Sequence, residues 1–175
     1  MNIFMLDRDP RVAANMHCDK HVVKMILETA QLLCTAHRVL DGDQWADETG
    51  LYKTAFKNHP CAVWVRDCVP NYVWAYQLFS GLLEEYFIRY GKVHSCKKLE
   101  EWLYFQPDNM KRFSWELHLD PNQPIRHRAV TTVPQCMPDK YKCDDPVQAY
   151  RNYYNGEKLS FAVWKSSEVP SWINV

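Results

Sequence analysis

The chain has 175 residues, and its 21 basic and 21 acidic side chains give a formal net charge of zero. This length corresponds to one ordinary domain and is enough to bury a hydrophobic core without stabilising crosslinks. The neutral charge excludes a general positive coat for polyanions, although a local basic patch can be balanced by acids on another face. Only 5 residues are Gly while 14% are aromatic, which disfavours a loop-rich or all-β fold and indicates a large buried surface.

The seven cysteines form no Cys-x-x-Cys pair, and several lie within apolar helical patterns. We expect reduced, buried thiols and neither a metal nor another cofactor, because no second pair of ligands has a metal-binding spacing. The first residues lack the basic and apolar regions of a secretion signal, and no apolar run reaches the roughly 18 residues of a membrane span. The expectation is a soluble, cytoplasmic protein with no membrane contact.

A short apolar segment, residues 2–6, precedes a long helix that is predicted from Pro10 to about Leu40. Asp9 can accept hydrogen bonds from the free N–H groups of the first turn, where Pro is also well tolerated. The pair Asp41-Gly42 ends the helix. A helix of this length spans roughly 45 Å at about 1.5 Å per residue, so we expect a bend in it.

A polar connection follows over residues 43–57, with one short helix expected near residues 50–56. Three helices are predicted next, over residues 61–68, 71–90 and 95–104. Asn58-His59-Pro60 starts the first of them, Gly91 ends the second, and Ser95 caps the third.

The stretch 106–143 is rich in proline and has little periodicity, which predicts a long loop. Its aromatic residues favour an ordered loop over a disordered one. A helix then covers residues 146–155 and continues over 157–165, and the tail 170–172 docks on the fold. The sequence therefore predicts an all-α protein: a single compact helical domain over residues 1–175, with five or more helices and a long, ordered, proline-rich loop.

The first predicted helix carries one narrow polar stripe on an otherwise apolar surface. At about 100° per residue, the five polar side chains of the stripe fall within a sector of about 80°. Two imidazoles beside an amine lower the pKa of that amine, which makes it nucleophilic near neutral pH, and a carboxylate one turn on can act as general acid or base. A solvated strip, or a structural ion pair of lysine with glutamate, is the alternative. The stripe consists of His17, His21, Lys24, Glu28 and Gln31.

Other polar residues are candidates for binding a substrate. His59 precedes a proline at a helix start, where it can equally be a capping residue. Arg66 and Asn71 lie in helices with aromatic neighbours. The basic residues Arg126 and Arg128, together with Lys111 and Arg112, form a local positive stretch that can contact DNA phosphates.

A family of small uncharacterised proteins encoded by tailed bacteriophages resembles this chain over nearly its whole length. The resemblance lies in the stretches MNIFMLDRDPRVAANMHCDKHVVKMILETAQLL, KNHPCAVWVRDCVPNYVWAYQLFSGLLEEYFIRYGKVH, CMPDKYK and DDPVQAYRNYYNGEK. It implies a protein that works in the cytoplasm of a bacterial host.

The order of elements also resembles, more distantly, the pyrimidine-dimer DNA glycosylases, the endonuclease V family of phage. The matching pieces are the apolar segment Phe4–Asp9, the helix from Pro10, and the stretch from Tyr52 to His59-Pro60. The resemblance implies a compact helical fold and DNA as the substrate. In that family the α-amine of a small second residue attacks the sugar after Met is removed, and a glutamate on the first helix assists.

This chain departs from that pattern at both catalytic positions. Residue 2 is Asn, which usually prevents removal of Met, and Lys24 stands where the family has its glutamate. Glu28, one turn later, is the candidate for the role of that glutamate. The fold and the substrate therefore carry over more securely than the lyase mechanism.

Three functions follow as hypotheses. The first is an enzyme that acts on a modified or damaged pyrimidine base in DNA, as a glycosylase or lyase, with the base flipped out into the polar stripe. The second is a transferase that joins an amino acid or amine to an activated thymine in phage DNA. The third is a phage interaction protein without enzymatic activity, in which the stripe is structural. The oligomeric state is left open.

Overall fold

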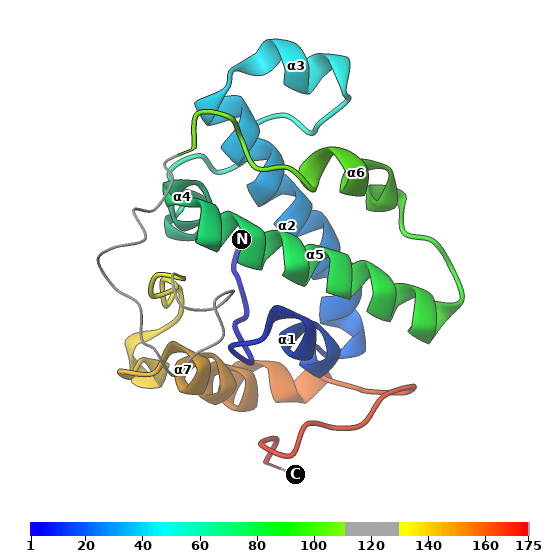
Figure 1. The fold of residues 1–175 in the computed structure, drawn as a ribbon. Coiled ribbons are helices and arrows are strands. Elements are labelled where there is room, and N and C mark those ends of the chain that lie inside the picture. Colours follow the sequence, from blue (N-terminus) through cyan, green and yellow to red (C-terminus); the bar gives the residue numbers. More distant parts are fainter. Residues whose placement is uncertain (111–129, 175) are drawn as a thin grey trace, which may run out of the picture.

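The computed structural model describes residues 1–110 and 130–174. Within these residues the chain forms seven α-helices and no β-strand, so the expected all-α fold with five or more helices is confirmed (Figure 1). The helices are α1 (Pro10–Met16), α2 (Asp19–Leu40), α3 (Asp43–Glu48), α4 (Pro60–Asp67), α5 (Val69–Tyr90), α6 (Glu100–Leu103) and α7 (Pro146–Tyr153).

The two longest helices, α2 and α5, cross at the centre of the fold, and both α1 and α4 pack against α5 (Figure 1). The inner face of α5 contributes Leu78, Phe79 and Leu82, which are fully buried. Burying each such side chain stabilises the fold by roughly 1.5–3 kcal/mol. Gly81 permits the close approach of α1, because a Cβ at this position would stand 3.0 Å from the Cβ of Ala14.

The predicted helix Pro10–Leu40 is wrong in one respect, because it breaks at His17 and Cys18, which both have extended backbone. The His17 ring donates from Nδ1 to the Ala13 carbonyl over 2.6 Å, and the Cys18 N–H donates to the Tyr154 hydroxyl over 3.1 Å. These partners replace the backbone hydrogen bonds of a continuous helix. His17 therefore lies outside α2 and does not share a helical face with the rest of the predicted stripe.

The connection after α2 also differs from the prediction, since its short helix is α3 and not a helix near residues 50–56. The reason is Arg38, whose buried guanidinium donates to Asp43 and to Asp47, at 2.7 Å each, and to the Tyr52 carbonyl at 2.7 Å. These partners lie on α3 and on the chain that returns from it. One buried arginine of α2 thus holds the whole connection in place.

The helix predicted over 95–104 is a 3-10 turn, Ser95–Leu99, followed by α6. The residue that caps it is His94 and not Ser95, because the His94 side chain accepts from the Cys96 N–H. The helix predicted over 157–165 is wrong in type and in length, because the helical turns end at Phe161. After α7 the chain forms a π-helical turn over Tyr154–Lys158 and a 3-10 turn over Leu159–Phe161. Tyr154 stands at the start of this irregular stretch. Its ring is buried, and its hydroxyl accepts from the Cys18 N–H at the break between α1 and α2.

The two ends of the chain pack on the fold. Residues 1–6 have extended or irregular backbone, and Ile3 and Leu6 are fully buried. The predicted docking of the tail is confirmed, because the Trp172 ring lies 5.8 Å from the Tyr154 ring.

The middle of the predicted proline-rich loop, residues 111–129, lies outside the described residues. The described ends of that loop contribute Met110 and Val133 to the hydrophobic core. In the described part of the chain, no helix has both the length and the apolar character needed to cross a membrane.

Candidate functional site

The two imidazoles of the predicted stripe lie in the interior. His17 is fully buried and His21 is 5% exposed, with its ring 4.7 Å from that of Phe4. His21 shares a 2.7 Å hydrogen bond between Nδ1 and the Tyr154 hydroxyl. Burial lowers the pKa of His17 to about 4 and that of His21 to about 3, since a charged ring would lose its hydration there. Both rings are therefore neutral at physiological pH and act as hydrogen-bonding members of the core.

Glu28 and Lys24 form a different environment two turns further along α2. The Glu28 side chain is 17% exposed, and its Oε1 lies 3.3 Å from Nζ of Lys24, which is 64% exposed. Its other oxygen, Oε2, accepts from the Asn2 N–H over 3.3 Å and lies 4.0 Å from the amino group of Met1. One half-buried carboxylate therefore faces two amines from separate parts of the chain.

Asn2 fixes the position of the chain start beside Glu28. Its Nδ2 donates to the Cys136 carbonyl over 2.9 Å, and its Oδ1 accepts from the Tyr150 hydroxyl over 2.8 Å. The Tyr150 side chain is fully buried, so α7 anchors this contact firmly. Asn2 is thus held by hydrogen bonds to two other segments, and it keeps the neighbouring Met1 amine close to Glu28.

A histidine and two cysteines lie near the Met1 amine. Among the described residues, the ligand atoms of His59, Cys61 and Cys136 all lie within 4.8 Å of one another. His59 caps α4 by accepting from the Cys61 N–H over 3.2 Å, and its pKa is lowered by burial and by the positive Met1 amine, against the opposing effect of Glu28.

The two cysteines face each other across this cluster. Their sulfur atoms are 3.7 Å apart although 75 residues separate them in the sequence. A hydrogen bond from the Cys61 thiol lowers the pKa of Cys136 to about 7, and the same contact raises the pKa of Cys61. We refer to the six residues of this region as the amino-terminal cluster: Met1, Asn2, Glu28, His59, Cys61 and Cys136.

The remaining predicted site residues lie outside the amino-terminal cluster or outside the described residues. Gln31 lies half-buried on α2. Arg66 donates to the Lys57 carbonyl over 2.6 Å. Asn71 is fully buried and donates to the Trp64 carbonyl over 2.9 Å and to the Thr131 hydroxyl over 2.8 Å, so it ties α4 and α5 to the segment after the loop. The basic residues Lys111, Arg112, Arg126 and Arg128 lie outside the described residues.

The structure pairs Glu28 with Lys24, and the charge of Glu28 also acts on His59. Sequence reasoning missed the other members of this region, which are Asn2, Cys61, Cys136 and Tyr150. The only local signal was the His-x-Cys spacing of residues 59 and 61. Cys136 comes from the segment that follows the proline-rich stretch, and no spacing in the sequence relates it to Cys61.

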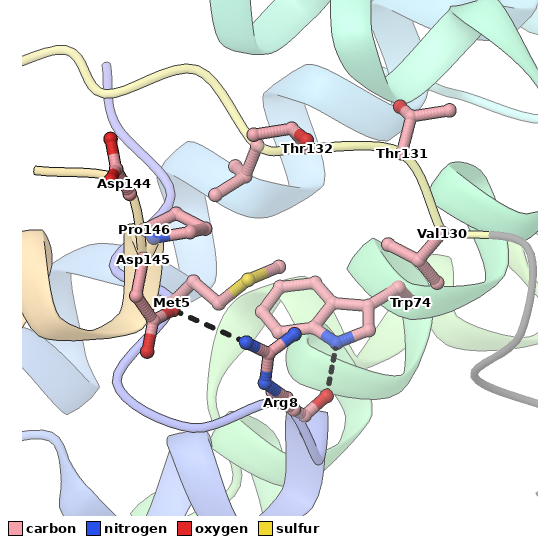
Figure 2. A pocket seen from close by; sticks show the side chains of 10 residues that line it. Met5, Arg8, Trp74, Val130, Thr131, Thr132, Asp144, Asp145 and Pro146 are labelled. Atoms are coloured by element: carbon pink, nitrogen blue, oxygen red, sulfur yellow. Dashed lines mark hydrogen bonds and ion pairs between the residues drawn. The ribbon is translucent and has the colours of Figure 1, made fainter. Parts of the chain in front are cut away.

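A pocket of about 420 Å³ is lined in part by the amino-terminal segment and by the segment that follows the proline-rich loop (Figure 2). Both segments also contribute residues to the amino-terminal cluster. Figure 2 shows Arg8 at its floor, bonded to Asp145 at 3.4 Å, while its carbonyl accepts from the Trp74 indole N–H over 2.8 Å. The apolar part of the lining includes Met5, Val130 and Val133. An indole ring, a guanidinium and two carboxylates line the pocket, but none of the predicted catalytic residues does.

Comparison of the chain with protein families, with curated proteins and with solved structures found no match. A function for this chain is therefore inferred from the geometry of the amino-terminal cluster.

Proposed function

We propose that this chain is an enzyme that acts on a pyrimidine nucleotide in DNA, with an amine beside Glu28 as the nucleophile. The observation that carries the proposal is the contact of one carboxylate with two amines, Lys24 Nζ at 3.3 Å and the Met1 amino group at 4.0 Å. An amine becomes a nucleophile when it loses its proton, and a carboxylate at this distance can take up that proton and return it.

In the proposed reaction the amine attacks C1′ of the sugar and forms a C–N bond there. The glycosidic bond breaks, its electron pair goes to the base, and the base leaves after taking a proton from water. Glu28 accepts the proton that the amine loses and delivers it to the ring oxygen as the sugar opens. The product is an iminium that joins C1′ to the protein, and its formation requires neither a metal nor a redox cofactor.

Two considerations support DNA as the substrate. The resemblance to pyrimidine-dimer glycosylases covers the segment around Phe4 and the start of the first helix. The basic residues 111, 112, 126 and 128 are suited to phosphate contacts, because Lys and Arg neutralise phosphates with release of counterions. A base within a duplex would be flipped out to bring C1′ to Glu28. The proposed setting is a bacterial cell infected by a phage.

Incubation of the protein with a panel of duplexes tests this function. The panel holds a cyclobutane pyrimidine dimer, 5-hydroxymethyluracil, an abasic site and an unmodified control, and free base and strand breaks are measured by mass spectrometry and gel electrophoresis. We expect base release or strand cleavage on at least one modified duplex. Unchanged DNA throughout the panel would overturn the proposal. A gain of mass on the DNA nucleosides, without base release, would also overturn it and would assign the chain to the transferase alternative.

A further inference from the structure

We propose that His59, Cys61 and Cys136 bind a zinc ion. This site goes beyond the proposed function and involves neither of the two amines beside Glu28. The three ligand atoms lie within 4.8 Å of one another, so the fold already gathers all three around one point. The expectation that the chain binds no metal was derived from ligand spacing in the sequence, and that spacing does not reveal a site whose ligands lie 75 residues apart.

The separation of the two sulfurs fits a tetrahedral zinc ion. Sulfurs that each lie about 2.3 Å from a tetrahedral zinc stand about 3.8 Å from each other. The observed separation of Cys61 Sγ and Cys136 Sγ is 3.7 Å. A disulfide would bring the two atoms to about 2.05 Å. The sulfurs are therefore already at the distance that zinc coordination requires, without movement of the backbone.

The ligands are held by rigid parts of the fold. His59 immediately precedes α4 and Cys61 lies in the first turn of α4, so the backbone of one helix start positions both. Cys136 lies in a turned segment, where its N–H donates to the Pro134 carbonyl over 3.1 Å and its own carbonyl accepts from Asn2. A site that is organised before the metal arrives loses little conformational entropy on binding.

The ligand set selects the metal. Thiolate and imidazole ligands favour zinc over magnesium and calcium, which take oxygen ligands. Two thiolates balance the charge of a divalent ion in a half-buried place, where an unbalanced charge would be costly. Three protein ligands leave the fourth tetrahedral position open to water, as in catalytic zinc sites and unlike the closed structural ones.

Metal analysis of the whole chain, purified under reducing conditions without chelator, tests the site. We expect one zinc ion per chain by inductively coupled plasma mass spectrometry. After removal of the zinc, addition of cobalt(II) alone should produce the strong near-ultraviolet absorption of thiolate-to-cobalt charge transfer and the visible bands of a tetrahedral ion. Replacement of one ligand, Cys136→Ser, should weaken cobalt binding at least roughly tenfold.

The matched control is Cys143→Ser, which makes the same change at an exposed cysteine seven positions further along the chain, outside the cluster. This variant should bind cobalt as the unmodified chain does. Absence of zinc together with absence of charge-transfer absorption in the unmodified chain would overturn the proposal, and this result does not depend on whether Cys136→Ser folds. A Cys61–Cys136 disulfide found by peptide mapping of the protein under the same reducing conditions would overturn it as well. Equal cobalt affinity in folded Cys136→Ser and Cys143→Ser would exclude these ligands.

Discussion

The two ends of the predicted polar stripe have different environments in the folded protein. At one end, His17 lies against Phe4, His21 lies against Phe4 and Tyr154, and both imidazoles are nearly inaccessible to solvent. At the other end, Glu28 is half-buried and faces the amines of Lys24 and Met1. The sequence presents both ends as equivalent polar residues on an apolar helix. The comparison teaches that tertiary partners decide whether a polar side chain on such a helix serves packing or chemistry.

The largest effect is expected at the chemical end of the stripe. Glu28→Gln keeps the size of the side chain but removes the group that takes up and returns protons, so the rate of base release should fall by about 10²–10⁴. Rates of release from the best duplex of the panel measure this effect. Glu84→Gln, which makes the same change at an exposed glutamate of α5, is the control and should retain the full rate. Equal rates in the two variants would refute the role of Glu28.

At the packing end of the stripe, a substitution should lower the stability of the folded protein. His21→Ala removes a buried ring from its contact with Phe4 and takes a hydrogen-bond partner from the Tyr154 hydroxyl. The free energy of unfolding should fall by roughly 2–4 kcal/mol. Urea titration at constant pH measures the change, and base release per folded molecule should stay the same. A stable His21→Ala variant without activity would place His21 in the chemistry instead.

The pH dependence of stability distinguishes the two ends further. The pKa of His17 is lowered to about 4 and that of His21 to about 3 in the folded chain, while both return to about 6.5 on unfolding. The unfolded chain therefore binds more protons below about pH 6.5, and the folded state loses stability as the pH falls. Between pH 7 and pH 5.5 the two rings together should cost roughly 2–3 kcal/mol of unfolding free energy. Urea titrations at both pH values measure the loss, and in His21→Ala it should be smaller by about half. An identical loss in both proteins would contradict the buried, neutral state of His21.

The smallest effect is expected for the ion pair between Lys24 and Glu28. Because Lys24 is 64% exposed, Lys24→Ala should change the free energy of unfolding by less than about 0.5 kcal/mol. Thermal or urea unfolding of the variant measures this. A loss of several kcal/mol would support the alternative in which the stripe is a buried structural network.

The parts of the fold that local signals determine were predictable. Asp9 and Pro10 start α1 and Gly91 ends α5, both as the sequence indicated. The failures occurred where a distant residue decides the local structure. The Tyr154 hydroxyl accepts a hydrogen bond from the backbone at the break after α1, and Arg38 binds Asp43 at the start of α3.

The candidate site shows the same division. Glu28, Lys24 and His59 were identified because their residue types and helical positions carry information by themselves. Asn2, Cys61 and Cys136 meet only through the fold, and the bond from Asn2 to the Cys136 carbonyl joins residues that 134 positions separate. No local pattern could have grouped them.

Trapping with borohydride tests the central claim, that an amine beside Glu28 attacks the sugar, most directly. The protein is incubated with the best duplex of the panel in the presence of sodium borohydride, which reduces an iminium to a stable amine. The adduct is then digested and its position is mapped by mass spectrometry. The account predicts one sugar adduct, located either on Lys24 Nζ or on the amino group of Met1. An adduct on any other residue, or base release with no trapped adduct, would contradict it.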